Sequence, residues 1–336
     1  MNQNEDFQFH GFPKVRLRRL RRTPAIRDLL QETRLSVKDL VCPIFVQEGI
    51  EESKEIESMP GIFRISIKDL IKNIEDLYDL GVKTFLIFGI PISKNNKATS
   101  AYRIDGIVQK SIKMLRQNFD EKIAIITDVC LCQYTTHGHC GIIKNNEANN
   151  DESLKVLKRI ATSHAEAGTD FVAPSAMMDG QVKNIRDALD NNHFNHVGII
   201  GYSAKLSSNL YTPFRDASHS KPEFGDRKSY QMPFYNTNEA LHEINMDIKE
   251  GADIIMIKPA LPYLDLIYKT RQTTLLPVCA YSVSGEYAIV KAAALEGLVN
   301  EDEVVMEFTT CIKRAGADII ISYHTKKIAE ILNNAK

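Results

Sequence analysis

Two lysines stand where an amine could bond covalently to a substrate. Lys258 directly follows the apolar run IIMI and precedes Pro259, so its backbone is expected at the end of a buried strand. Lys205, in GYSAKLSS, holds the matching place one strand earlier. Neighbouring strands lie about 4.8 Å apart, so the two amines would repel and at least one pKa would be lowered. A neutral amine can attack a carbonyl to give a Schiff base, whereas salt bridges to carboxylates are the structural alternative.

A cluster of thiols is the second candidate for chemistry. Cys130, Cys132 and Cys140 lie in DVCLCQYTTHGHCG with His137 and His139 between them, and the other three cysteines are expected as small buried residues. In a long chain without a signal peptide, such clustering indicates metal binding more often than a disulfide. Three thiolates with an open fourth position describe a catalytic zinc site. A structural site completed by a histidine is the main alternative. His137 and His139 could also be ordinary histidines of a surface loop.

A long insertion at about 205–237 is the third candidate. It mixes cations with aromatic residues, namely Arg215, Lys221, Arg227 and Lys228 with Tyr211, Phe214 and Phe224, and adds Gln231. Loops of this length in a compact domain are usually functional. Guanidinium groups on such a lid suit bidentate capture of a carboxylate, and lid closure would exclude water from imine chemistry. A solvated loop of mixed charge is the alternative.

These candidates need a scaffold, and the apolar runs predict one. Eight strand-like segments occur at 40–46, 83–90, 122–130, 170–176, 196–204, 253–260, 276–285 and 318–324. Between most of them lie segments with helical spacing, four of which end in glycine. Strands that are apolar throughout are buried on both faces, and alternation with helices implies parallel crossovers. We therefore expect a single (β/α)8 TIM barrel with the lysines and thiols at the carboxyl ends of its strands. An open doubly wound sheet is the rival, but no G-x-G-x-x-G follows the first strand.

Composition limits the remaining classes of function. The chain has 336 residues, 43% of them hydrophobic, and a formal net charge of -1. This balance argues against a dedicated nucleic-acid binder, and no apolar run approaches the roughly 18 residues of a membrane span. The start, MNQNEDFQFH, is too acidic and polar for a secretory signal. We expect a cytoplasmic protein that binds neither nucleic acid nor membrane.

One segment departs from this charge balance. KVRLRRLRR, at 14–22, carries six basic residues. Apolar residues interrupt the charges, which favours an arm that packs on an acidic surface of this or a sibling subunit over a nucleic-acid arm or a transit peptide. We expect an N-terminal arm at 1–33 that makes oligomer contacts and a catalytic barrel at 34–336.

The motifs together resemble a known family. The chain is similar to the porphobilinogen synthases, also called 5-aminolaevulinate dehydratases, in order over nearly its whole length. The segments that carry the resemblance are DVCLCQYTTHGHCG, APSAMMDGQV, GYSAKLSSNLYTPFRDA, FGDRKSYQMP, EGADIIMIKPALPYLD and YSVSGEYAIV.

The resemblance implies an activity and a role for each matched residue. The activity is the asymmetric condensation of two 5-aminolaevulinate molecules to porphobilinogen with loss of two waters, in tetrapyrrole (haem) biosynthesis. Lys258 would form the Schiff base on the propionate side and Lys205 the one on the acetate side. The other matches are Cys130, Cys132 and Cys140 for catalytic Zn2+, Asp128 and His139 for its support, Ser284 and Tyr323 for one substrate carboxylate, Arg215, Arg227 and Gln231 for the other, and Tyr281, Phe214 and Ser175 for the pocket.

Some positions separate this chain from other members. Many members lack the three cysteines, so their retention places it in the zinc-dependent subset. Ala176 stands where others carry Asp, and Ser229 where some have a further cysteine. Glu243 corresponds to an allosteric Mg2+ ligand, although His242 replaces the usual Arg beside it. The resemblance also implies a homo-oligomer, an octamer, formed through the N-terminal arm.

Three other interpretations remain. Another Schiff-base aldolase on the same barrel would need only one such lysine and no thiolate zinc. A non-catalytic zinc-binding interaction protein would leave the paired lysines unexplained. An inactive scaffold would not require the full set of matched residues.

Overall fold

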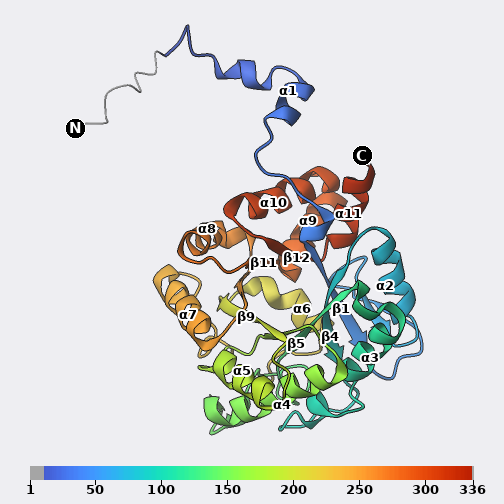
Figure 1. Ribbon diagram of the computed structural model, residues 1–336. Coiled ribbons are helices and arrows are strands. Elements are labelled where there is room, and N and C mark those ends of the chain that lie inside the picture. The colour runs from blue at the N-terminus through green and yellow to red at the C-terminus, as the bar shows by residue number, and fades with distance from the viewer. Residues whose placement is uncertain (1–10, 335–336) are drawn as a thin grey trace, which may run out of the picture. The chain divides into compact units, whose positions relative to one another are not determined.

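Eight parallel strands close into a barrel in the computed structural model, which describes residues 11–334 (Figure 1). Around the barrel the order is β1, β4, β5, β8, β9, β10, β11 and β12, and β12 pairs back onto β1. The strands are β1 (Leu40–Gln47), β4 (Thr84–Ile90), β5 (Ala124–Val129), β8 (Phe171–Pro174), β9 (Gly198–Lys205), β10 (Ile254–Lys258), β11 (Val278–Ser282) and β12 (Ile319–Ser322). All eight lie within the predicted runs, apart from one residue added at the end of β1 and of β9, so the barrel prediction is confirmed.

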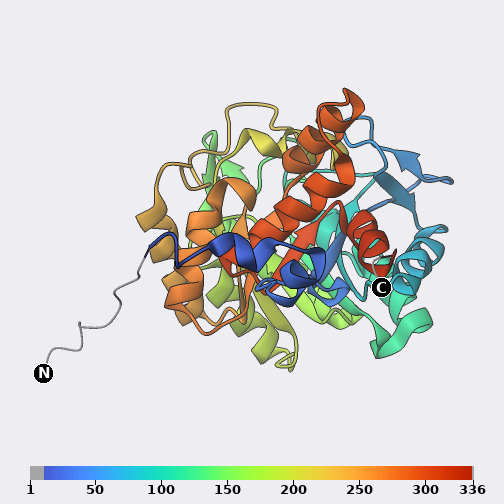
Figure 2. The same ribbon diagram turned by 90° about the horizontal axis from the view of Figure 1, so that it is seen from above.

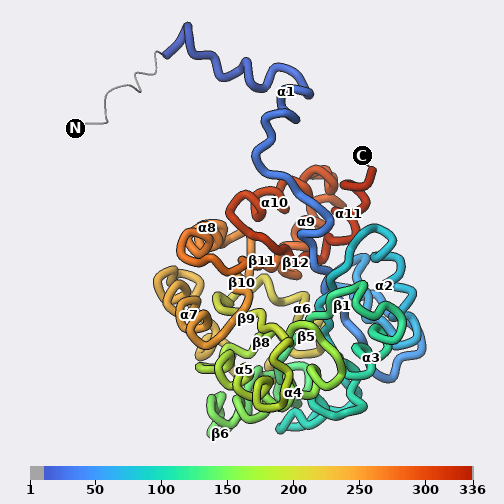
Figure 3. The backbone as a smooth tube through the Cα atoms, viewed as in Figure 1, coloured from blue at the N-terminus to red at the C-terminus, as the bar shows by residue number. Residues whose placement is uncertain are grey.

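Helices form the outer layer around these strands (Figures 2 and 3). They are α2 (Leu70–Asp79), α3 (Ile107–Phe119), α4 (Asn150–Ala167), α5 (Gln181–Asn191), α7 (Thr237–Glu250), α8 (Leu264–Thr273), α9 (Ser284–Leu295), α10 (Glu301–Ala315) and α11 (Thr325–Asn334). The expected glycine directly follows α4 and α7, as Gly168 and Gly251, and stands one residue later after α2 and α9, as Gly81 and Gly297. All four have positive φ, a conformation that glycine tolerates best. No helix within 11–334 is both long and apolar enough to cross a membrane.

Shorter strands and helices lie before β1 and in the loops that connect the barrel's elements. β3 (Phe63–Ser66) pairs with β1 and with β2 (Lys54–Glu55), and β6 (Ile142–Lys144) and β7 (Glu147–Asn149) form a separate hairpin. The short helices are η2 (Val37–Asp39), η3 (Thr99–Tyr102), η4 (Asp120–Lys122), η5 (Asn209–Tyr211), α6 (Thr212–Ala217) and η6 (Leu261–Tyr263). The sequence analysis predicted none of these, and η5 and α6 give the 205–237 insertion a regular beginning.

The N-terminal segment is a compact unit by itself. The chain divides into Met1–Arg34 and Leu35–Lys336, one residue from the expected boundary. Within 11–34 the unit contains η1 (Leu17–Arg21) and α1 (Pro24–Leu29), which Thr23 caps through a hydrogen bond from the Ile26 amide. No side chain of 11–34 is buried. The apolar residues of this unit are therefore free to be covered by another surface.

Candidate active site

The two lysines are direct partners across neighbouring strands. Lys258 is opposite Lys205 in the register of β10 and β9, and only 5% and 6% of their surfaces are exposed. Lys205 Nζ donates a hydrogen bond to the carbonyl of Ser175. Within 11–334 neither lysine forms a salt bridge with a carboxylate, so the structural alternative is not what the protein uses.

Aromatic rings surround the amine of Lys258. Its Nζ lies 4.0 Å from the ring centroid of Tyr281, 5.2 Å from that of Phe214 and 5.2 Å from that of Tyr202. Burial, and then the positive charge of Lys205, lower the pKa of Lys258 to about 7. A substantial fraction of this amine is therefore neutral, and nucleophilic, near pH 7.

The three thiols of the loop after β5 come together. Sγ atoms of Cys130, Cys132 and Cys140 all lie within 4.8 Å of one another, and all three residues are buried and free of disulfides. Hydrogen bonds from Cys130 and Cys132 hold the pKa of Cys140 well below its usual value, with help from the charge of Arg227. Sulfurs around one tetrahedral metal are about 3.8 Å apart at Zn–S distances of about 2.3 Å. The spacing and the donor type both fit a metal ion.

One carboxylate lies near both this loop and the lysines, whose positive charges oppose the rise in its pKa that burial causes. Asp128, at the end of β5, accepts a hydrogen bond from Gln133 Nε2 at 2.9 Å, and its second oxygen has no partner within 11–334. Cys132 Sγ in turn contacts Gln133 Oε1 at 3.4 Å. Gln133 was missed in the sequence analysis, because its role depends on both partners rather than on its own position in a motif.

The insertion is folded over the thiols. Arg227 is 5% exposed, and its guanidinium donates to the carbonyls of Gly138 at 2.8 Å and Ser220 at 2.6 Å. Both ring nitrogens of His139 contact the insertion, Nδ1 at 3.1 Å from Tyr230 Oη and Nε2 at 2.9 Å from the Phe224 carbonyl. His139, predicted to support a metal, is thus bonded to this lid.

Two glycines allow the lid to come this close. A Cβ on Gly138 would lie 2.4 Å from the carbonyl oxygen of Lys221, and one on Gly285 would lie 2.5 Å from Cα of Leu210. Each of these Cβ atoms would collide with backbone, so any residue other than glycine at either position would force the lid to move away. Neither glycine was singled out from the sequence, since the approach is between distant segments.

Some of the residues predicted to hold a substrate carboxylate are engaged within the protein, and others keep unpaired atoms. Ser284 Oγ donates to the Leu210 carbonyl at 3.1 Å and accepts from the Phe214 amide at 3.0 Å. The hydroxyls of Tyr281 and Tyr323 lie 3.0 Å apart. Arg215 and Gln231 keep buried polar atoms without hydrogen-bond partners within 11–334. These unpaired atoms are available to a bound ligand.

One small cavity joins these groups. Its volume is about 20 Å3, and its lining includes Lys205, Lys258, Asp128, Cys132 and Arg227. About 10 to 15 Å3 suffices for one water, so the closed lid leaves room for little more. Any larger ligand requires the lid to move.

Glu243 lies outside this centre. It lines a separate cavity of about 480 Å3 with Asp179 and Glu239. Burial raises the pKa of Glu243, and the negative charges of Asp179, Glu250 and Glu239 add to this. A cation would relieve this repulsion, but Glu243 has no part in the lysine and thiol cluster.

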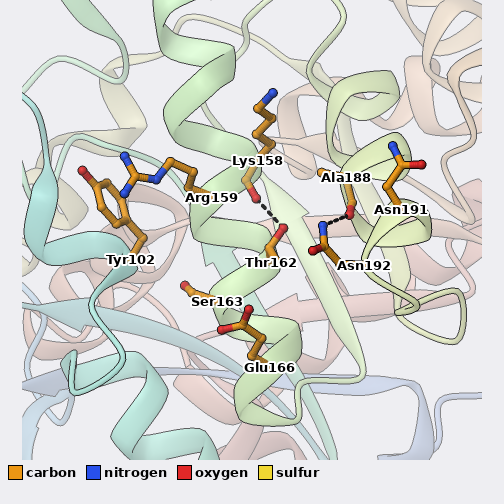
Figure 4. A pocket seen from close by; sticks show the side chains of 9 residues that line it. All are labelled: Tyr102, Lys158, Arg159, Thr162, Ser163, Glu166, Ala188, Asn191 and Asn192. Carbon is orange, nitrogen blue, oxygen red and sulfur yellow. Dashed lines mark hydrogen bonds between the residues drawn. The ribbon is translucent and has the colours of Figure 1, made fainter.

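A surface groove of about 450 Å3 between α4 and α5 is also separate (Figure 4). In it the guanidinium carbon of Arg159 lies 3.8 Å from the ring centroid of Tyr102. It shares no lining residue with the lysine cavity, so it holds none of the predicted chemistry.

The fold and this site together define an enzyme of the (β/α)8-barrel class, with its candidate reacting groups at the carboxyl ends of the strands. The delta-aminolevulinic acid dehydratase family, a family of lyases, matches residues 14–331, and the chain belongs to this family.

Individual relatives agree over nearly the whole length. Delta-aminolevulinic acid dehydratase of Archaeoglobus fulgidus is 52% identical over 321 residues, which cover 96% of this chain and 99% of that protein. The Bacillus subtilis protein of that name is 48% identical over 317 residues, covering 94% and 98%. A crystal structure of delta-aminolevulinic acid dehydratase (porphobilinogen synthase) from Toxoplasma gondii in complex with the reaction product porphobilinogen has a TM-score of 0.94 at 39% identity, and covers 96% of this chain and 92% of that one.

Proposed function

We propose that this protein is a porphobilinogen synthase, which condenses two molecules of 5-aminolaevulinate to porphobilinogen with loss of two waters. The observation that carries the proposal is the direct pairing of Lys258 with Lys205, in one cavity with Cys132. Two buried amines serve two ketone substrates, whereas an ordinary Schiff-base aldolase needs one. Family membership and the likeness to a product complex support the same reaction.

The lysines carry the covalent steps in this proposal. The neutral amine of Lys258 attacks the ketone carbon of the substrate on the propionate side, and the oxygen leaves as water after proton transfer. Lys205 forms the second Schiff base, on the acetate side. The rings of Tyr281 and Phe214 beside Lys258 exclude solvent, which slows hydrolysis of the imine.

Side chains around the lysines hold the two substrates. Arg215, Arg227 and Gln231 of the lid bind one carboxylate, and the unpaired atoms of Arg215 and Gln231 support this role. Ser284 and Tyr323 bind the other carboxylate, and Ser175 adds a polar group to the pocket wall. Because Ser284 is bonded to lid backbone in the closed site, lid opening must release it before it can bind substrate.

The thiols are the ligands of a catalytic Zn2+ in this proposal. Cys130, Cys132 and Cys140 would hold it, and Asp128 would support the site from the end of β5. When bound, zinc would polarise a carbonyl or hydroxyl oxygen and stabilise a departing water. Among residues 11–334 no histidine, carboxylate or further cysteine joins the group of three buried thiols, which supports a catalytic site with an open fourth position over a structural one.

Two further features belong to the same proposal. A homo-octamer, formed through the N-terminal arm, agrees with the exposed apolar and basic residues of 11–34. Mg2+ near Glu243, as an allosteric ion, agrees with the acidic lining of that cavity. The protein would act in the cytoplasm.

Borohydride reduction tests the central proposal. The protein is incubated with 5-aminolaevulinate, reduced, digested and analysed by mass spectrometry. We expect reduced adducts on the peptides that contain Lys258 and Lys205, and none when substrate is omitted. The absence of adduct at both lysines in folded, zinc-loaded protein would show that the proposed mechanism is wrong.

A further inference from the structure

The carboxylate of Glu286 is buried at the barrel mouth, and no role proposed above uses it. Glu286 lies in the first turn of α9 and is 6% exposed. Its Oε2 accepts from the Val283 amide at 2.5 Å, its Oε1 from the Leu261 amide at 2.7 Å, and a longer contact of 3.5 Å joins Oε2 to the Ala260 amide. The Val283 bond is a capping interaction of the helix. A cap does not need the other two bonds.

These amides belong to the segments that directly follow two neighbouring strands, β10 and β11. Two of them follow Lys258 by two and three residues, and the third directly follows β11. The paired register of β10 and β11 ends at Ile257 opposite Ala280. Lys258 and Tyr281 therefore lie beyond the last pair, and Glu286 joins the two segments just past them.

The amine of Lys258 lies beside this junction. Lys258 Nζ lies 4.0 Å from the Tyr281 ring centroid, and Ser284 begins the same helix that carries Glu286. Burial of a carboxylate is costly unless hydrogen bonds compensate it. Glu286 is buried where the segments after β10 and β11 meet, and its hydrogen bonds to both segments supply this compensation. Burial raises the pKa of Glu286 to about 7, while the three amides oppose the rise.

We propose that Glu286 is a positioning residue, whose carboxylate fixes the strand end of Lys258 against that of Tyr281 and Ser284. Within 11–334 its hydrogen bonds go to backbone amides only, the positive charge of Lys258 acts on it through space, and it takes no part in bond making. The inference rests on the proposed function, since it concerns the geometry of the Schiff-base lysine. Lys205 enters the barrel mouth on β9 and has no bond to Glu286, so its position should depend on this residue much less.

Two substitutions separate the contributions of the carboxylate. In Glu286→Gln the side chain keeps only one acceptor oxygen. Its NH2 group then faces a backbone N–H of one of the two segments, and two donors cannot form a hydrogen bond. In Glu286→Asp the charge remains, but the side chain is one methylene shorter and cannot span both segments. Glu303→Gln is the matched control, because Glu303 also lies in the first turn of a helix, α10, but is exposed.

The test compares trapping at the two lysines in the full-length protein. Wild type and the three variants are reduced with borohydride in the presence of 5-aminolaevulinate, and adducts at Lys258 and Lys205 are quantified separately. We expect Glu286→Gln to slow trapping at Lys258 and to lower kcat by roughly ten- to hundredfold, because a misplacement of about 1 Å can cost that much. Trapping at Lys205 and KM should change little. Glu286→Asp should also slow trapping at Lys258, because it keeps the charge but cannot span both strand ends, and Glu303→Gln should match wild type.

Several outcomes would overturn the inference. Trapping at Lys258 within twofold of wild type in Glu286→Gln would show that the carboxylate is not needed. Equal losses at both lysines, in step with a lowered melting temperature, would show a general structural role. If Glu286→Gln does not fold, Glu286→Asp decides by the same comparison. Failure of wild type to form adducts at either lysine would instead reject the proposed function, and this inference with it.

Discussion

At the scale of single residues, the proposed reactivity of Lys258 comes from burial of its amine and from the like charge of Lys205 beside it. Lys258 and Lys205 are register partners, and no carboxylate within 11–334 forms a salt bridge with either. An ion pair would have held both amines protonated. Removing water and adding a neighbouring cation favour the neutral form of Lys258 instead, which is the form that attacks a ketone.

This arrangement predicts a pH dependence for adduct formation. Because the pKa of Lys258 is lowered to about 7, trapping at Lys258 should be half-maximal near that pH and level off about one pH unit above it. Well below the pKa it should fall roughly tenfold per pH unit, as protonation removes the nucleophile. In Lys205→Met the neighbouring cation is lost, so the pKa of Lys258 should rise and the profile should move to higher pH. Trapping rates at Lys258 from pH 5 to 9 measure both, with Lys221→Met as the control. An unmoved profile in Lys205→Met would contradict the role of the neighbouring charge.

The thiols give a second prediction at this scale. Chelation should abolish activity and remove zinc, and added Zn2+ should restore both, because a three-thiolate site supplies the metal with most of its ligands. Cys132→Ser should lose bound zinc and activity together, whereas Cys311→Ser, outside the cluster, should retain both. Metal content by mass spectrometry and enzyme assays measure this. Full activity of a verified metal-free preparation would reject zinc.

At the scale of elements, the lid and the thiol loop hold each other closed. Arg227 donates to the carbonyl of Gly138, the Glu223 amide donates to the His137 carbonyl, and His139 contacts Tyr230. The same contacts reduce the cavity to about 20 Å3. The surface on which the lid packs is thus the loop that carries the proposed zinc ligands, so we expect binding at the thiols and closure of the lid to affect each other.

Removing one of these contacts should loosen the lid. Tyr230→Phe deletes the hydroxyl that lies 3.1 Å from His139 Nδ1 and 3.4 Å from the Cys140 amide. A hydrogen bond contributes about 1 kcal/mol, which corresponds to roughly fivefold in an opening equilibrium. Amide hydrogen exchange across residues 219–232 should therefore be faster by about this factor. Tyr235→Phe, at a residue that is 74% exposed, is the control, and equal exchange in both variants would contradict this role of Tyr230.

The elements also show how far the sequence could predict the site. Long apolar strands and the glycines that follow helices can be recognised from short stretches of sequence. The barrel and the pairing of Lys258 with Lys205 could therefore be predicted from the spacing of these features. The partners of Gln133, His139 and Glu286 could not, because each is set by contacts between segments far apart in the chain. The helices η5 and α6 were missed for a related reason, since the lid sequence has no sustained periodicity and folds against the barrel.

At the scale of the whole molecule, the near-zero net charge conceals an unequal distribution. Six basic residues are concentrated at 14–22 in a chain whose net charge is -1, so the rest of the chain is acidic on balance. Within 11–34 no side chain is buried, and the exposed apolar residues include Leu17 and Leu20. A segment with apolar and cationic side chains and no core of its own gains most by packing on a large acidic surface.

We therefore expect the arm to support assembly of the proposed octamer. Deletion of residues 1–22 should give a smaller species in sedimentation velocity, because both the apolar and the basic side chains are lost. Leu17→Ser with Leu20→Ser should weaken assembly independently of salt, since burial of apolar surface is not screened. The contribution of the basic residues should instead decline as ionic strength rises and the Debye length falls from about 10 Å at 0.1 M to about 3 Å at 1 M. An assembly that is unchanged by the deletion would contradict the oligomer role and leave nucleic-acid binding or targeting to explain the basic run.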